Sequence, residues 1–332
     1  MIEIYSGNNI DLIQWDRLVE TSSVSSFFQT KECYQFYCSL SFVEAFVYGV
    51  TEDGKLKGLI CGYVVSNGGM LKKFFSRRAI IQGGALLADD ISDDALKLLL
   101  NYTKNKLRKK AIYVECRNSN DYSKFKHVFE QTSFKYEDHL NFIVNVQETE
   151  NPFCKLSSSK RRQINISRKA GVSVCESKKT EDLDQFYSLL QNLYKNKIKK
   201  PLFPKEFFEK LIQLPGGHLF VAKYNQQVVS GMISVSFNQN TLYEWFVGGD
   251  KDEHNHLYPS VAITYCAIEY ASKNGFKKFD FMGAGKPNED YGVREFKEKF
   301  GGELVEYGRF IHINNIPLYN IGKIAIKLMS KF

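Results

Sequence analysis

The sequence predicts an α/β protein built from two similar units in tandem, and three observations support that class. Apolar segments with the alternation of β-strands interchange with segments whose apolar residues recur at helical spacing. The second half of the chain repeats the order of these segments in the first half, at a nearly constant offset. The length of 332 residues exceeds that of one average domain. We therefore expect two mixed sheets, each covered by helices.

The first half begins with hairpin signals and continues with a helix. Asp53-Gly54 separates two apolar runs, as the turn of a hairpin does. Leucines then recur at helical spacing between Ser92 and Lys109. The expected elements are strands Val43–Val50, Leu56–Val65 and Ala79–Ala88, helix Ser92–Lys109, strand Ala111–Cys116, helix Tyr122–Gln131 and strand Leu140–Val146.

The second half repeats this order. Pro259 suits the first position of a helix, and Gly275 suits the position just after its end. The expected elements are strands His218–Tyr224, Val228–Phe237 and Leu242–Val247, helix Ser260–Asn274, strand Lys277–Phe281, a helix around Val293–Phe300 and strand Glu303–Ile311. We therefore place an N-terminal domain at residues 1–150 and a C-terminal domain, which carries the expected active site, at residues 151–332.

The C-terminal domain is expected to begin with a basic helix at residues 155–170. No acidic residue occurs from Asn151 to Cys175, and serines 157–159 suit a helix N-cap. Its cations are Lys155, Lys160, Arg161, Arg162, Arg168 and Lys169. Three interpretations stay open for this helix: a solvated linker, a contact to phosphate groups of a precursor or of tRNA, and attraction to a membrane surface.

Composition and charge bear on the partner, the redox compartment and the location of the protein. The net charge of +8 favours an anionic partner. Seven cysteines without a C-x-x-C pair indicate a reducing compartment and no disulfide framework. The N-terminus shows no signal-peptide pattern, and no apolar run has the length of a membrane span. The expected location is cytoplasmic, with the inner face of the membrane as an alternative that the basic, amphipathic tail from Pro317 to Phe332 keeps open.

The segment from Phe276 to Gly302 is the most informative for chemistry. It combines a strand, a loop with Gly283 and Gly285, and a short helix that carries a cation. Glycines allow backbone amides to approach a ligand, and a neighbouring cation can stabilise an anionic group or a developing oxyanion. The segment therefore indicates an acyl-transfer site or a phosphate-binding site.

Other site types are disfavoured. The loop from Met282 to Gly292 lacks the Ser or Thr and the helix of a nucleotide-hydrolysing loop. Residues 248–256, GGDKDEHNH, fit no standard set of metal ligands, so we expect an exposed loop and no metal. Neither a G-x-S-x-G elbow nor a Cys with an evident His partner occurs. Direct attack by an acceptor amine on a donor ester is therefore favoured over a covalent enzyme intermediate.

The motifs SSSKRRQINISRKAGV, YEWFVGG, YPSVAITYCAIEYASKNG, FDFMG and VREFKEKFGG resemble the Fem family, the peptidoglycan-bridge aminoacyltransferases within the GNAT acyltransferase superfamily. The resemblance is strongest from about Asp138 to Tyr307. It implies two tandem GNAT-like domains. It also implies an acyl or aminoacyl donor, aminoacyl-tRNA or acyl-CoA, with no permanently bound cofactor. Two features depart from the family: Thr180–Leu214 is too short for the helical arm of many tRNA-using members, and neither half carries the acyl-CoA glycine run.

The resemblance places Phe296 and Lys297 at the reaction centre and makes Arg161 and Arg162 binding candidates. It also places Trp245, Tyr258 and Ser260 along the cleft. From the residues themselves, Tyr291 and Arg294 could hold a carboxylate or phosphate of the acceptor, although Arg294 could equally pair on the surface. Asp280 could orient a substrate amine or satisfy a neighbouring group. Lys297 would stabilise charge on the ester oxygens during transfer.

These observations predict transfer of an aminoacyl or acyl group onto an amine of a cell-wall or phosphate-bearing precursor. The precursor is expected to be a small molecule or lipid-linked, with tRNA as a further partner and no DNA. One alternative is an acyl-CoA-dependent N-acyltransferase. Another is a catalytically degenerate Fem-like protein that binds anionic precursors or RNA without turnover.

Overall fold

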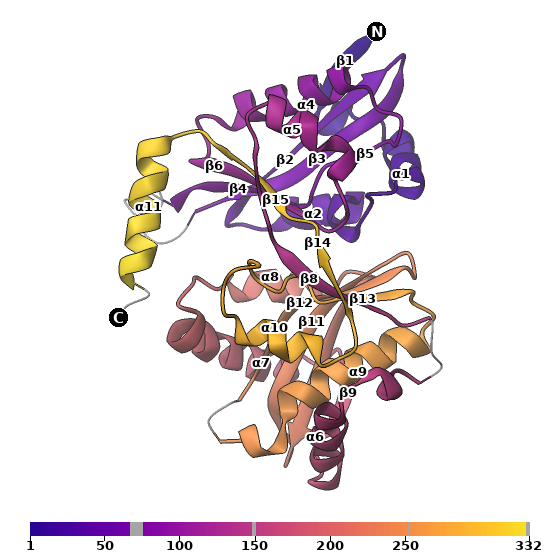
Figure 1. Cartoon of the computed structure of the whole chain (residues 1–332), viewed down its shortest axis with the longest axis vertical. Helices are drawn as coiled ribbons and strands as arrows, with labels where there is room; N and C mark the ends of the chain where they lie inside the picture. The colour runs from indigo at the N-terminus through magenta and orange to yellow at the C-terminus, as the bar shows by residue number, and fades with distance from the viewer. Residues whose placement is uncertain (67–75, 148–150, 251–252, 330–332) are drawn as a thin grey trace. The chain divides into compact units, whose positions relative to one another are not determined.

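The computed structural model describes residues 1–66, 76–147, 151–250 and 253–329. The chain forms two compact units, which are described separately (Figure 1). Unit 1 comprises Met1–His139 together with Glu306–Phe332, and unit 2 comprises Leu140–Val305. Among the described residues, no helix combines the length and the apolar character that crossing a bilayer requires.

Unit 1 contains an eight-stranded mixed sheet. Its strands are β1 (Ile2–Ser6), β2 (Val43–Glu52), β3 (Lys55–Val65), β4 (Arg78–Gly83), β6 (Tyr113–Asn118), β15 (Arg309–Ile313) and β7 (Lys135–Glu137), in this spatial order, with β5 (Leu86–Leu87) paired to β3. Strands β4 and β6 pair in parallel. The other pairs are antiparallel, as the hairpin between β2 and β3 requires.

The helices of unit 1 are α1 (Leu12–Thr21), α2 (Lys31–Ser39), α4 (Asp93–Leu107), α5 (Lys126–Gln131) and α11 (Ile316–Met329), with 3-10 turns at Gly7–Asn9, Phe27–Gln29 and Ser123–Phe125. Helix α4 begins where the Ser92 hydroxyl caps the amide of Ala95. Its leucines at 96, 99 and 100 lie on one face and join a core with Val114 and Phe310. Helical spacing thus produces the buried face expected from the sequence.

Unit 2 contains a seven-stranded mixed sheet. Its strands, in spatial order, are β14 (Glu303–Glu306), β8 (Leu140–Asn145), β13 (Lys278–Asp280), β12 (Thr241–Gly249), β11 (Gln227–Phe237), β10 (Gly217–Tyr224) and β9 (Ser173–Ser177). Strands β12 and β13 pair in parallel, whereas β8, β11, β10 and β9 pair antiparallel with their inner neighbours.

The helices of unit 2 are α6 (Ser158–Lys169), α7 (Thr180–Leu193), α8 (Lys205–Leu211), α9 (Pro259–Lys273) and α10 (Gly292–Glu298), with 3-10 turns at Pro152–Lys155 and Asn255–Leu257 and a π-helical turn at Tyr194–Ile198. On β11, Met232 lies in the core that α9 covers. The neighbouring Gly231 faces Phe186 of α7, whose ring would lie 2.5 Å from a Cβ there. Because successive strand residues face opposite sides, helices cover both faces of this sheet.

The division into units differs from the boundary expected at residue 150. Strand β8 lies in the sheet of unit 2, and β15 lies in the sheet of unit 1, so each unit contains a strand from the other half of the sequence. Figure 1 shows magenta β8 beside orange strands and yellow β15 beside purple ones. Strand pairing between distant segments leaves no local signal, which explains the difference.

Two strands expected to be continuous are interrupted at glycines. The run Ala79–Ala88 breaks at Gly83 and Gly84, whose φ angles are 85° and 87°. The run Glu303–Ile311 divides into β14 and β15 around Gly308, whose φ is 60°. A β-strand needs negative φ, so each of these glycines ends the ladder locally.

We predict that Gly308→Ala destabilises the chain more than Gly275→Ala. Both glycines have positive φ, which costs an alanine about 1–2 kcal/mol. A Cβ at Gly308 would also lie 2.2 Å from the ring of Tyr136, whereas nothing lies within 4 Å of one at Gly275. Overpacking should add about 1–3 kcal/mol at Gly308 alone. Urea unfolding measures both variants, and equal losses would show that the Tyr136 ring moves aside freely.

Candidate active site

The site forms where β12 and β13 stop pairing. The two parallel strands pair only from Thr241 to Tyr243 and from Lys278 to Asp280. Beyond this point the carbonyls of Phe281 and Gly283 accept hydrogen bonds from a side chain instead: Lys297 Nζ of α10 donates to them at 2.6 and 3.0 Å. The ammonium therefore occupies the place where the two strands end their contact.

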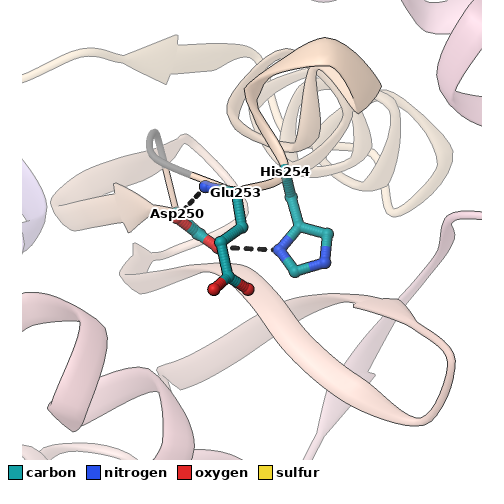
Figure 2. A group of neighbouring side chains, drawn as sticks. All are labelled: Asp250, Glu253 and His254. Carbon is teal, nitrogen blue, oxygen red and sulfur yellow. Dashed lines mark hydrogen bonds and ion pairs between the residues drawn. The ribbon is translucent and has the colours of Figure 1, made fainter.

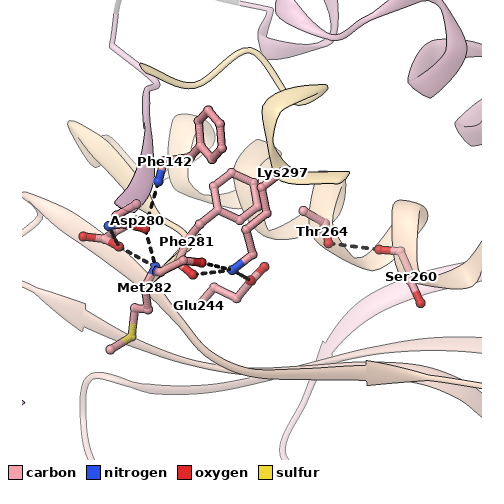
Figure 3. A network of polar contacts seen from close by, with 10 residues as sticks. Phe142, Glu244, Ser260, Thr264, Asp280, Phe281, Met282 and Lys297 are labelled. Carbon is pink, nitrogen blue, oxygen red and sulfur yellow. Dashed lines mark hydrogen bonds and ion pairs between the residues drawn. The ribbon is translucent and has the colours of Figure 1, made fainter. Parts of the chain in front are cut away.

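A buried carboxylate faces this ammonium. Glu244 Oε1 of β12 lies 3.0 Å from Lys297 Nζ, and only 3% and 9% of the two side chains are exposed (Figure 3). An ammonium has three N–H donors. Phe281 O, Gly283 O and Glu244 Oε1 account for all three. Lys297 is thus a buried, fully hydrogen-bonded cation, and not a solvated lysine of the helix surface.

Sequence reasoning missed Glu244. Burial raises the pKa of its carboxyl, and the charge of Lys297 opposes that rise. Its second oxygen, Oε2, is buried without a hydrogen-bond partner. The register of β11 and β12 shifts so that Ser234 pairs with Glu244 and Ile233 pairs with Phe246, which leaves Trp245 as an extra residue. Such a bulge redirects side chains. An acidic residue inside the apolar run LYEWFV was the available signal.

The glycine loop uses its amides internally. Gly283 N donates to Asn141 Oδ1 at 2.7 Å, and Ala284 N donates to Leu140 O at 2.6 Å. Gly283 therefore does not present its amide as expected. Gly285 has a φ of 78°, and a Cβ there would lie 2.9 Å from the ring of Tyr291. In this conformation, the packing of Tyr291 accounts for the glycine without any close approach of a ligand.

Asp280 satisfies neighbouring hydrogen-bond donors, the second of the two roles considered for it. Its Oδ1 accepts hydrogen bonds from Asn141 Nδ2 at 2.7 Å and from Met282 N at 2.6 Å. Burial raises the pKa of this carboxyl, and these hydrogen bonds oppose the rise. Asp280 and Asn141 together hold the start of the loop whose carbonyls reach Lys297. The role of Asn141 had no signal in the sequence.

Arg294 braces the same loop. Its Nε donates to Ala284 O at 2.9 Å, its Nη1 donates to Pro287 O at 3.2 Å, and its Nη2 donates to the carbonyl of Lys286. These contacts direct all three nitrogens towards backbone carbonyls, and Arg294 forms no ion pair with an acidic side chain among the described residues. Tyr291 is exposed to 42% and packs on Gly285 of this loop.

The basic helix reaches α10 through Lys160, which sequence reasoning did not select. Lys160 Nζ lies 3.8 Å from the centre of the Phe296 ring, a cation–π contact. Burial, together with the charge of Lys299, lowers the pKa of Lys160 to about 8. Arg161 Nη1 instead donates to Cys154 O at 3.1 Å, and Arg162 is exposed. Helical rotation directs Lys160 inward and its two neighbours outward.

The remaining candidates lie near β12 and α9 in different roles. Trp245 packs edge-on against Phe207 of α8, with ring centres 5.2 Å apart. Tyr258 precedes α9 with a φ of 53°. The carbonyl of Ser260 accepts a hydrogen bond from Thr264 Oγ1 at 2.9 Å (Figure 3). Neither Tyr258 nor Ser260 has a hydrogen bond or ion pair with Lys297 among the described residues.

Asp250, Glu253 and His254 bring metal-ligating atoms within 4.8 Å of one another (Figure 2). The contacts between them are internal to the turn. Asp250 Oδ2 bonds His254 Nδ1 at 2.7 Å, and Asp250 Oδ1 accepts from Glu253 N at 3.2 Å. Both oxygens of Asp250 therefore close the turn before α9, and this geometry provides no reason to assign an ion.

Comparison with known proteins relates unit 2 to a family. Residues 157–298 match the family described as acetyltransferase (GNAT) domain. Aminoacyltransferase FemA of Staphylococcus epidermidis is 33% identical over 89 residues, which are 25% of this chain and 21% of that protein. FemA of Staphylococcus aureus is 35% identical over 80 residues, 23% of this chain and 19% of that protein. The matched segment is thus a small part of both relatives.

Solved structures resemble the chain over nearly its whole length. A crystal structure of FemX aligns with 96% of this chain and 99% of its own, with a TM-score of 0.70 and 15% identity. A tandem GNAT protein from the clavulanic acid biosynthesis pathway aligns with 95% of this chain and 99% of its own, with a TM-score of 0.59 and 9% identity. These likenesses confirm the predicted fold of two tandem GNAT-like domains. The predicted resemblance to the Fem-type GNAT family is also confirmed.

We predict that Glu244→Gln changes the pH dependence of stability. Burial raises the pKa of this carboxyl, so the folded chain holds the proton more tightly than the unfolded chain does. The free energy of unfolding of the wild type should fall, relative to that of the variant, as the pH rises from the usual value of 4.5 towards neutrality. Urea unfolding across this range tests the sign of this change. A rise with pH in the free energy of unfolding of the wild type relative to that of the variant would contradict the prediction.

Proposed function

We propose that this chain transfers an acyl or aminoacyl group from an ester or thioester donor to an amine of a cell-wall or phosphate-bearing precursor. One observation carries the proposal: the buried ammonium of Lys297 lies where parallel strands β12 and β13 separate, next to Phe296 on the same helix. The match of residues 157–298 to a GNAT domain supports acyl transfer as the reaction class.

The chemistry explains why a cation belongs there. When the amine attacks, an N–C bond forms and the carbonyl oxygen gains negative charge. The C–O or C–S bond of the donor then breaks, and the leaving oxygen or sulfur takes up the proton that the amine loses, so an amide and an alcohol or thiol result. A fixed cation in a site without water stabilises the negative charge on the carbonyl oxygen and on the leaving atom. Removing a donor of this kind typically costs about 3 kcal/mol in the transition state.

The hydrogen bonds of Lys297 indicate how it engages a substrate. All three donors are occupied, so an oxyanion has to replace one acceptor. Gly283 O is the acceptor to exchange, because it lies at 3.0 Å whereas Phe281 O lies at 2.6 Å. Met282, a non-glycine residue, has a φ of 55°, which only a tightly held loop maintains. Glu244 keeps its position as the counter-charge during this exchange.

Two donors are compatible with this site. An aminoacyl ester of tRNA is favoured because the matched curated relatives are aminoacyltransferases. Acyl-CoA is the second candidate, since the matched family is described as an acetyltransferase domain. The acceptor would carry phosphate and would be a small molecule or lipid-linked, in accordance with the chain's net charge of +8.

We predict that Lys297→Ala lowers kcat by at least about 100-fold, because the cation beside the reacting carbonyl is lost. Lys299→Ala is the matched control, since it removes an exposed cation from the end of the same helix and should change kcat less than about threefold. Steady-state transfer of labelled donor to an amine acceptor measures both.

Loss of one partner of a buried pair can unfold a chain at a cost of about 3–5 kcal/mol. The double variant Lys297→Met with Glu244→Gln removes both charges and keeps most of the volume, so it should fold and still be inactive. Transfer at the wild-type rate in either Lys297 variant would overturn the proposal.

We predict that labelled aminoacyl-tRNA transfers its amino acid and that labelled acetyl-CoA does not. The physical reason is the basic surface of α6, which suits a polyanionic donor, and raising the salt concentration should weaken the reaction steeply. Both donors are offered to the same preparation with a mixture of amine-bearing wall precursors. Label transferred only from acetyl-CoA would establish acyl-CoA as the donor. Saturable binding of either donor without transfer would indicate a degenerate transferase.

A further inference from the structure

One face of the sheet in unit 1 carries a group of charged residues that the proposed reaction does not use. On β6, Val114 and Cys116 point into the apolar core. Alternation therefore places Tyr113, Glu115 and Arg117 on the opposite face. This second face is polar in the middle of a sheet, where apolar residues are the rule, and the arrangement needs a physical explanation.

Glu115 is the centre of the group. It accepts a hydrogen bond from Arg117 Nη2 at 3.0 Å and another from Arg309 Nη1 of β15 at 2.6 Å. Burial alone would raise the pKa of Glu115, but the two guanidinium groups outweigh it and lower that pKa to about 2. Arg309 Nη2 also donates to His139 Nε2 at 2.8 Å, so that ring nitrogen is an acceptor. One carboxylate thus serves two guanidinium groups.

Two cations share one carboxylate in this group. Arg78 of β4 joins Arg117 in acting on the hydroxyl of Tyr63, and Glu137 of β7 is opposite Arg309 in the sheet. Arg117 and Arg309 both bond Glu115 in a half-buried position, and a further anion beside them would stabilise these cations.

Arg117 has donors to spare. Its side chain is 34% exposed, its Nη2 bonds Glu115, and its Nη1 donates no hydrogen bond among the described residues. It lies near the carboxyl end of β6, in register with Gln82 near the carboxyl end of the parallel strand β4. Ligands of α/β sheets commonly bind at the carboxyl ends of parallel strands. The position and the unused donors therefore indicate the same occupant, an anion.

We propose that Arg117 is the main contact of a second, anion-binding site in unit 1, which takes a carboxylate or phosphate group through the fork of its guanidinium. Glu115 and Arg309 are positioning residues that fix this fork. The site shares no residue with the Lys297 site. It goes beyond the proposed transfer reaction, and its test needs no turnover.

The test is isothermal titration of the full chain at low salt with two probes, inorganic pyrophosphate and glutarate. Saturable binding of at least one probe is expected, and the stronger binder identifies phosphate or carboxylate as the preferred group. Arg117→Ala should weaken binding at least about tenfold, and Arg117→Lys should recover only part of it, because a point charge lacks the fork. Arg108→Ala is the control, since it removes an exposed arginine of unit 1.

Three outcomes would overturn the proposal. Equal weakening in the Arg108 and Arg117 variants would show attraction by net charge alone. Absence of saturable binding of either probe to the wild type would show that the group only holds the sheet together. If Arg117→Ala does not fold, Arg117→Gln keeps one hydrogen bond to Glu115, and wild-type affinity in that folded variant would also contradict the assignment.

Discussion

The ammonium of Lys297 at the end of the β12–β13 pairing is the constraint on which the rest of unit 2 depends. Parallel strands that separate leave carbonyls without partners, and buried carbonyls have to be satisfied. A single side chain from α10 satisfies those of Phe281 and Gly283, and it binds Glu244 as well. The loop, the helix and the strand are thereby tied to one nitrogen atom, which links the stability of this region to its chemistry.

The contacts around that nitrogen explain why the loop from Met282 to Gly285 keeps an uncommon backbone conformation. Met282, Gly283 and Gly285 all have positive φ. Asp280 and Asn141 fix the beginning of this stretch, and Arg294 fixes its end through three carbonyls. In a non-glycine residue such as Met282, this conformation is strained and persists only where neighbouring contacts impose it, and such strain is common at functional sites. Asp280 and Asn141 also occupy the amides of Met282 and Gly283, which a glycine loop could otherwise offer to a ligand.

The two units share a fold but differ in where they place charge. In unit 2 a lysine sits where two parallel strands separate. In unit 1 the corresponding parallel pair, β4 and β6, stays in register up to Gly83 and Asn118, and its face carries arginines bound to Glu115. A duplicated scaffold thus holds one buried cation, to which we assign the transfer reaction, and one half-buried cationic group, to which we assign an anion. The residues at equivalent ends of the strands decide the difference.

The sequence by itself determined the alternation of strands and helices and the duplication, and it selected Phe296 and Lys297 as candidates, because periodicity and motifs are local properties. Tertiary structure alone decided the exchange of β8 and β15 between units, since strand pairing joins residues far apart in the chain. It also decided the surroundings of Lys297: its partner Glu244, the residue Asn141 that holds Gly283, and Lys160 over the ring of Phe296 become recognisable only when separate segments converge. Burial, which no residue type reveals by itself, turned an ordinary glutamate into the counter-ion of the site.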